Sequence, residues 1–237
     1  MNRSHSRAVR RSLMPIVNTV FLASLLLGPW TACLADDLFA SPTGSGSSFT
    51  RAAPGALQDA VDAASVGDTV WLAQGTYKGS GSQVLSLTKN VEVRGGWDGA
   101  ASGGLVVDPV QYPAALDGEN IRRVVSITGG HTAILQDVTV TSGRGVDGGG
   151  IFISNASPEI RGCIVVANQS YALSGSGNRG AGIGVFGNGS PTIVANTVVG
   201  NAGGYGAGLY QHAGTGSTIR GNRFQNNIAA SSGGGLL

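Results

Sequence analysis

A four-residue glycine motif, in which Gly-Gly-Gly or Gly-Ala-Gly is followed by Ile or Leu, constrains the fold of this chain most. Its four copies begin at Gly148, Gly180, Gly206 and Gly233, at spacings of 32, 26 and 27 residues. A repeat of this length cannot bury an apolar face by itself, so successive repeats are expected to stack on one another. The 40 glycines among 237 residues also exclude a helical bundle, because each interior glycine would cost about 1 kcal/mol there.

The segments between the glycine motifs repeat as well, as short strands separated by a bend. Residues 160–165, 193–198 and 219–224 align, and each is followed by an asparagine, at Asn168, Asn201 and Asn227. In a strand pattern Ile193 and Val198 point inward, and Asn196 lies at the bend between them. Parallel stacking at about 4.8 Å per coil would place equivalent apolar residues and asparagines above one another. The prediction is an all-β stack of coils in which buried amides bond to each other.

Residues 36–237 are expected to form this single β domain. Near its start, Leu57, Ala60, Val61 and Ala64 are spaced as on one face of a helix, which predicts a short capping helix at about 55–64. Short strands are predicted at 69–73, 75–77, 84–87 and 91–97, followed by an irregular loop at 97–115. The last motif copy ends at Leu237 without the continuation of the earlier copies, so the stack is predicted to be truncated at its C-terminal end.

Residues 1–35 have the pattern of a secretory signal peptide, with a basic start, an apolar run and small residues before Asp36. Two alternatives stay open: an uncleaved membrane anchor, and a lipoprotein with the lipid on Cys33. Four of the 15 basic residues lie in this segment, so 11 basic and 13 acidic residues remain after cleavage, a net charge of 11 − 13 = −2. This balance gives no electrostatic argument for nucleic-acid binding.

Several stretches of the mature chain resemble segments of a known protein family. They are residues 40–46, the helix at 55–64, residues 67–77, and Arg94-Gly95-Gly96-Trp97-Asp98-Gly99. These stretches resemble the N-terminal cap and first coils of secreted bacterial right-handed parallel β-helix proteins with the pectin-lyase-like fold. Residues 224–227 and 233–236 resemble the repeats of polymorphic outer-membrane proteins. The resemblance implies a right-handed parallel β-helix solenoid, and it leaves the activity open because that fold carries lyases, hydrolases, adhesins and non-catalytic surface proteins.

The acidic residues limit where catalysis could occur. Residues 148–237 contain one carboxylate, Glu159, whereas glycoside hydrolysis needs a pair and a calcium site needs several. The candidate catalytic residues therefore lie earlier in the chain: Asp98, Asp108, Asp117, Glu119, Asp137 and Asp147, with Arg122, Arg123, Arg144 and His131 as possible partners. Among them Asp137, Arg144 and Asp147 are the preferred candidates because they are close in sequence. The same three residues are also explained as polar residues of turns.

Aromatic residues beside turns are the predicted ligand-binding residues. Trp97 and Tyr112 bracket the irregular loop, and Tyr205 and Tyr210 lie next to glycine turns. An exposed ring in such a place can stack on a sugar. The alternative for Tyr210 is packing against a neighbouring coil, since single surface aromatics are common.

Binding without catalysis is the leading interpretation. A lateral face rich in Asn, Ser, Thr and Gly, with a few tyrosines, would bind polysaccharide or another cell-surface component, and the protein would be secreted or held at the cell surface. The alternative is a polysaccharide lyase or glycoside hydrolase with its groove on the first coils or beyond Leu237. No cofactor, metal site or nucleic-acid partner is expected, and Ca²⁺ belongs only to the enzyme alternative. No membrane span is expected after removal of the signal peptide.

Overall fold

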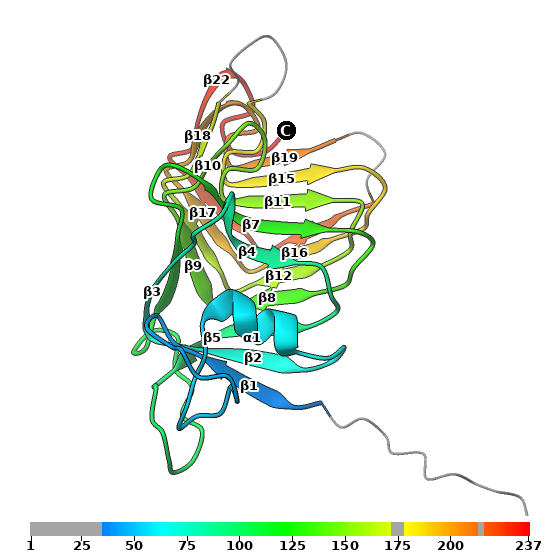
Figure 1. Ribbon diagram of the computed structural model, residues 1–237. Helices are drawn as coiled ribbons and strands as arrows, with labels where there is room; N and C mark the ends of the chain where they lie inside the picture. The colour runs from blue at the N-terminus through cyan, green and yellow to red at the C-terminus, as the bar shows by residue number, and fades with distance from the viewer. Residues whose placement is uncertain (1–34, 172–177, 213–215) are drawn as a thin grey trace, which may run out of the picture. The chain divides into compact units, whose positions relative to one another are not determined.

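The computed structural model describes residues 35–171, 178–212 and 216–237, which belong to one compact unit, Leu34–Leu237. The chain winds through successive coils, and each coil adds one strand to several parallel sheets (Figure 1). The predicted all-β stack of coils is therefore confirmed. The predicted signal peptide, residues 1–35, lies outside the described residues except for Ala35, and Cys33 lies outside them too; both remain predictions.

The strands of the coils form four parallel sheets, here numbered 1 to 4 in the order in which the chain reaches them within a coil that has a strand in each. Sheet 1 contains β1 (Asp37–Ala40), β2 (Thr69–Ala73), β5 (Glu92–Trp97), β8 (Ile134–Gln136), β12 (Glu159–Arg161), β16 (Thr192–Val194) and β20 (Thr218–Arg220). Sheet 2 contains β3 (Gly75–Lys78), β6 (Ala114–Asp117), β9 (Val138–Thr141), β13 (Ile164–Val166), β17 (Thr197–Val199) and β21 (Arg223–Gln225). Sheet 3 contains β10 (Arg144–Gly145), β14 (Gln169–Ser170), β18 (Ala202–Tyr205) and β22 (Ile228–Ser232). Sheet 4 contains β4 (Gln83–Leu87), β7 (Arg123–Thr128), β11 (Ile151–Ser154), β15 (Ile183–Phe186) and β19 (Leu209–Gln211).

The coils are numbered by their sheet 1 strand. Coil 1 begins with β2, coil 2 with β5, coil 3 with β8, coil 4 with β12, coil 5 with β16 and coil 6 with β20. Coils 1 and 2 have no strand in sheet 3, so their chain runs from sheet 2 to sheet 4 through residues 79–82 and 118–122. The predicted irregular loop lies in coil 2, between Trp97 and Ala114.

Inward side chains of successive coils form continuous apolar columns. In sheet 1, Leu135, Ile160 and Ile193 occupy paired positions, and all three are fully buried. In sheet 2, Val165 pairs with Val198, and both are fully buried. The alternate residues face outward because side chains on a strand have a period of two. The predicted inward positions of Ile193 and Val198 are confirmed.

Buried asparagines form two hydrogen-bonded columns at the bends on either side of sheet 2. The amide of each asparagine donates to the amide oxygen in the next coil at 2.9–3.0 Å, in the pairs Asn168–Asn201, Asn201–Asn227 and Asn196–Asn222. Each amide also donates to a backbone carbonyl of the preceding coil, as Asn201 does to Val165 at 3.0 Å. These bonds satisfy polar groups that would be costly to bury alone. The expected asparagine columns are confirmed.

The predicted capping helix is present as α1 (Leu57–Ala63). It is shorter than expected, because Ala56 and Ala64 have extended backbone. Leu57 and Val61 are buried against the core, and α1 packs on β1, β2 and β4, which covers this end of the coil stack (Figure 1). Among the residues that the structure describes, no helix is long and apolar enough to cross a membrane.

The burial of Cys163 predicts a loss of stability at alkaline pH. The side chain is 1% exposed and its thiol donates to the Leu135 carbonyl at 3.5 Å, and burial raises its pKa to about 12. A free cysteine titrates near a pH of about 8.5, so the folded state holds the thiol proton more tightly than the unfolded state. This contribution to stability is complete below about pH 8.5 and is lost as the pH rises toward the folded pKa.

We expect Cys163→Ala to lose less free energy of unfolding than the wild type between about pH 8 and about pH 10.5. Urea titrations at both pH values measure this difference. The thiol is the ionisable group by which the two proteins differ, so the comparison isolates its contribution. Parallel pH curves for the two proteins would contradict the assignment.

Candidate functional site

Three aromatic rings stack on the outer face of sheet 4. The ring centroids of Phe152 and Phe186 lie 5.4 Å apart, those of Phe186 and Tyr210 lie 5.5 Å apart, and each pair is inclined by 29°. The rings come from β11, β15 and β19, in three successive coils, and all are partly exposed. They form a row along the coil stack that we call the aromatic ladder.

Phe186 enters the ladder from a different register position than its neighbours. Phe152 and Tyr210 both align with Gly184, whereas Phe186 aligns with Ser154. A Cβ on Gly184 would lie 2.7 Å from a ring carbon of Phe186. The absence of a side chain at Gly184 therefore lets the Phe186 ring fold back over β15 into the gap between the flanking rings.

A paired arginine and aspartate border the ladder. Arg179 Nε and Nη2 donate to Oδ1 and Oδ2 of Asp147 at 3.0 and 2.8 Å, and the Arg179 backbone N–H donates to Oδ1 at 3.1 Å. The guanidinium lies 4.9 Å from the ring centroid of Phe186 and 5.3 Å from that of Tyr210. Hydrogen bonding to Asp147 raises the pKa of Arg179, and burial opposes this increase. One arginine thus connects coils 3, 4 and 5.

Tyr205 occupies the position in coil 5 that corresponds to Asp147 in coil 3 and Arg179 in coil 4. The three residues form successive parallel bridges from coil 3 to coil 5. Tyr205 ends β18, and it is 42% exposed. All three lie where the chain passes from sheet 2 through sheet 3 to sheet 4, which we call the sheet 3 corner. A carboxylate, a guanidinium and a phenol ring therefore follow one another along this corner.

Arg123 packs on Phe152, at the coil 3 end of the aromatic ladder. Its guanidinium lies 4.3 Å from the ring centroid of Phe152. Its Nε and Nη2 donate to the carbonyl oxygens of Gly148 and Asp147 at 3.1 and 2.9 Å. Burial lowers the pKa of Arg123, and the nearby charge of Asp147 opposes this effect. Arg123 therefore supports the turn that carries Asp147.

Arg144 is the more accessible arginine of the sheet 3 corner. Its guanidinium lies 4.4 Å from the ring centroid of Tyr171, in the next coil. Arg144 is exposed, and its side chain forms no hydrogen bond or ion pair within the described part of the chain. The cation–π contact orients the guanidinium while leaving its N–H groups available to a ligand.

The structure brings four of the predicted site residues together at or beside this corner: Arg144, Asp147, Tyr205 and Tyr210. Asp137 lies elsewhere, at the bend between β8 and β9 that leads from sheet 1 to sheet 2. Its φ of 56° is left-handed, and its Oδ2 accepts a hydrogen bond from Gln136 Nε2 at 2.6 Å. Asp137 thus has the turn role that the sequence also allowed, and it does not join Asp147 in one site.

The prediction that Trp97 binds a ligand is wrong, because this side chain is fully buried. Its ring packs edge-on against Phe39, with centroids 4.9 Å apart, in a small cluster that also contains Trp71 and Val107. Tyr112 is partly buried in the turn before β6, where its backbone N–H donates to the backbone carbonyl of Asp108 at 2.8 Å. Its role in binding stays a prediction, separate from the sheet 3 corner.

Three residues of the site were missed from the sequence: Phe152, Arg179 and Phe186. A signal for part of the set was present in the repeats. The residue before each of the first three glycine motifs is Asp147, Arg179 or Tyr205, and the residue after each motif is Phe152, Gly184 or Tyr210. Aligning these flanking positions would have identified the corner and two rungs of the ladder.

The site offers cations, hydroxyls and ring edges, and its carboxylate is already paired. Within residues 35–171, 178–212 and 216–237, no group of three His, Cys, Asp or Glu side chains could hold a metal ion. Arg179 donates three hydrogen bonds to Asp147, so this carboxylate is engaged. The arrangement can donate hydrogen bonds to an acceptor-rich ligand and contact a sugar ring.

A family model described as "Right handed beta helix region" matches residues 106–236, which include the ladder and the sheet 3 corner. The chain belongs to the right-handed β-helix family. No curated protein matches it. The likeness of the repeats to polymorphic outer-membrane proteins stays a prediction.

A solved structure supports the same fold. This right-handed β-helix protein is similar to the crystal structure of pectate lyase Pel9A, with a TM-score of 0.52 and 17% sequence identity. The similarity covers 81% of this chain and 48% of that chain, so this chain spans about half of its length. At this identity the likeness shows the fold, and the activity has to be argued from the site.

Proposed function

We propose that this chain is a secreted or cell-surface β-helix protein that binds polysaccharide along the sheet 3 corner without cleaving it. The observation that carries the proposal is the row of Arg144, Tyr171, Arg179 and Tyr205, which places guanidinium groups and tyrosine rings at successive coils of one edge. A polymer with repeated hydroxyl or acidic groups matches a surface that itself repeats at each coil.

Two residues of the row are suited to contact a ligand directly. Tyr205 is 42% exposed and can place its ring against a sugar. Arg144 is held over Tyr171 with its guanidinium exposed, so little side-chain freedom is lost when it binds an anionic or hydroxyl group. Phe186 contacts both Phe152 and the Arg179 guanidinium, and Arg179 is bridged to Tyr205 in the next coil.

The state of the carboxylates supports binding over cleavage. Glycoside hydrolysis uses two carboxyl groups on either side of the scissile bond, but Asp137 and Asp147 lie at different bends of the coil. Asp147 is already held by Arg179 through both of its carboxylate oxygens, so the pair is built as an ion pair within the protein. The fold likeness to a pectate lyase keeps a lyase or hydrolase as the alternative, and that alternative predicts turnover that depends on Asp137, Arg144 or Asp147.

Localisation outside the cytoplasm is part of this proposal and depends on the predicted signal peptide, residues 1–35. Lipid attachment at Cys33 is the alternative route to the cell surface. Mass spectrometry of the protein purified from its native membrane and medium fractions would identify the mature N-terminus.

We expect the wild type to bind at least one polysaccharide of a panel of polygalacturonate, alginate, xylan and laminarin, as measured by affinity gel electrophoresis. Tyr205→Ala should weaken binding about fivefold, which corresponds to about 1 kcal/mol for a lost ring contact. Arg144→Gln should weaken binding of the acidic polymers by a similar factor. Arg220→Gln is the matched control, because Arg220 is also exposed but lies in sheet 1 of coil 6.

The same samples, with and without Ca²⁺, are assayed for new reducing ends and for the ultraviolet absorbance of unsaturated products. We expect neither to increase with time. Turnover that disappears in Asp147→Ala or Arg144→Gln would replace the proposal with the enzyme alternative. Equal affinity of Tyr205→Ala, Arg144→Gln and the wild type would show that binding occurs on another face.

A further inference from the structure

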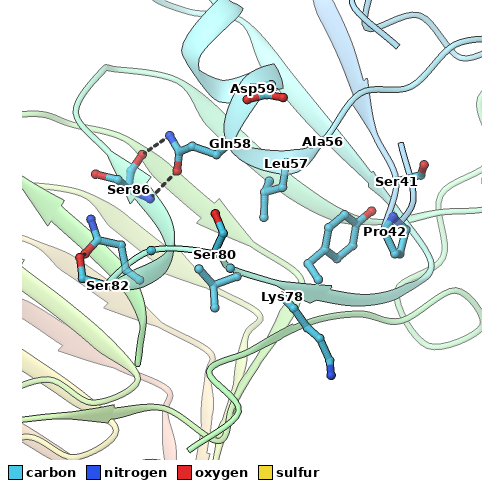
Figure 2. A pocket seen from close by; sticks show the side chains of 15 residues that line it. Ser41, Pro42, Ala56, Leu57, Gln58, Asp59, Lys78, Ser80, Ser82 and Ser86 are labelled. Atoms are coloured by element: carbon cyan, nitrogen blue, oxygen red, sulfur yellow. Dashed lines mark hydrogen bonds between the residues drawn. The ribbon is translucent and has the colours of Figure 1, made fainter. Parts of the chain in front are cut away.

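A cleft of about 480 Å³ lies between α1 and residues 79–82, which connect β3 to β4 (Figure 2). Its lining mixes apolar and hydroxyl groups, among them Pro42, Leu57, Val84, Ser41, Ser80 and Ser82. Figure 2 shows the Leu57 side chain extending from α1 toward the segment that carries Ser80. The volume falls in the range of about 300–1,000 Å³ that is typical of small-molecule sites.

The shape of the cleft is built into the fold. Gln58 on α1 and Ser86 on β4 hold its two sides together, because the Gln58 amide donates to the Ser86 carbonyl at 3.2 Å and accepts from the Ser86 N–H at 2.8 Å (Figure 2). A Cβ on Gly79 would lie 2.6 Å from the Gln83 carbonyl oxygen, so the chain passes too close there for a side chain. The cleft is therefore formed before a ligand arrives.

The charges around the cleft favour a neutral ligand. Lys78 extends away from it (Figure 2), and its ammonium pairs with Glu119 at 3.1 Å. Asp59 is then the remaining charged side chain of the lining. Hydroxyls, one carboxylate and apolar side chains match a hydroxylated ring that has an apolar face, as a neutral sugar has.

The cleft lies at the coil 1 end of the sheet 3 corner. Residues 79–82 connect sheet 2 to sheet 4 in coil 1, as the sheet 3 strands do in coils 3 to 5. Coil 1 is joined to coil 2 at this corner by the Lys78–Glu119 pair, and coil 2 to coil 3 by the Arg144 N–H, which donates to the Arg122 carbonyl at 2.8 Å. The cleft is thus two coils, or about 10 Å, from Arg144 along the stack.

We infer that this cleft binds a terminal neutral sugar of the polysaccharide that lies along the sheet 3 corner. The inference rests on the proposed function. Because α1 packs across the stack beside the cleft, a glycan that follows the corner from coil 5 toward coil 1 ends there. The protein would then recognise chain ends, with Arg144 and Tyr205 contacting the sugars that follow.

Blocking the cleft tests the inference. A Cβ on Gly81 meets no atom within 4 Å and its φ is not left-handed, so Gly81→Trp places a large side chain beside the cleft without backbone strain. Gly104→Trp is the matched control, because Gly104 has the same free space but lies in the loop between β5 and β6. With the polysaccharide that the wild type binds in the panel, we expect at least tenfold weaker binding for Gly81→Trp and unchanged binding for Gly104→Trp.

Partial acid hydrolysis of the same polysaccharide provides the second measurement, because it multiplies the chain ends at constant mass. An end-binding protein should saturate at more protein per unit mass of glycan after hydrolysis, and Gly81→Trp should abolish this increase. If Gly81→Trp binds like the wild type, or if the capacity does not rise with the number of ends, the inference is overturned while the proposed function stands. If the wild type binds no polymer of the panel, the proposed function fails first.

Discussion

Replacing Ile193 with aspartate is expected to prevent folding of the β-helix. Ile193 is fully buried and lies between Ile160 and Ile219 in the apolar column of sheet 1. The change removes about 2 kcal/mol of apolar burial and places a carboxylate without a partner in the core, which costs several kcal/mol more. Folded domains are stable by only about 5–15 kcal/mol. Circular dichroism should lose its strand signal, and thermal unfolding should lose its cooperative transition.

The matched control is Val194→Asp on the same strand. Val194 points outward and pairs with Arg161 and Arg220 in the neighbouring coils. A carboxylate there is solvated and lies between two arginine positions, so the stability should change by less than about 1 kcal/mol. A cooperative transition for Ile193→Asp close to that of Val194→Asp would refute the inward column.

Replacing Asn201 with alanine is expected to lower the free energy of unfolding by about 3–5 kcal/mol, because each buried group left without a partner costs about 1–3 kcal/mol. Asn201 is fully buried, and its amide oxygen accepts from the backbone N–H and the amide of Asn168 at 2.9 and 3.0 Å. Its own amide donates to the Val165 carbonyl at 3.0 Å. The alanine variant leaves these groups unpaired in the interior. Urea unfolding followed by circular dichroism measures the loss.

Two further variants calibrate this value. The amide oxygen of Asn201 accepts two hydrogen bonds, whereas that of Asn196 accepts one, from the Cys163 N–H at 2.9 Å. Asn196→Ala should therefore cost less, about 1–3 kcal/mol. Asn188 is exposed, and Asn188→Ala should change stability by about 0.5 kcal/mol or less. Equal stabilities of the Asn201 and Asn188 variants would show that the asparagine column contributes nothing to the free energy of unfolding.

Features that repeat along the chain were predictable. The glycine motif spacing predicts the coils, and period-two alternation places Ile193 and Val198 inside. The same frame predicts the asparagine columns, because identical coils in register bring identical side chains together. Helical spacing also predicts α1, and the helix differs from the prediction only at its ends, where Ala56 and Ala64 are extended.

The aromatic ladder was only partly predictable. Phe152 and Tyr210 occupy the same position of the repeat, so the coil alignment alone places them on one face. The Phe186 ring joins them from another position because Gly184 leaves space beneath it. The conformation of one side chain over a glycine depends on the packing of three coils, and no local pattern encodes it.

By itself, the sequence determined the all-β stack, its inward columns and its capping helix, because these depend on spacings that every coil repeats. The tertiary structure alone decided that Trp97 is buried against Phe39, that Arg179 pairs with Asp147, and that a cleft opens beside α1. Each of these features joins residues of different coils or of a coil and the cap. Such contacts are made by side chains that do not repeat, so their partners are chosen only when the coils are in register and the core is closed.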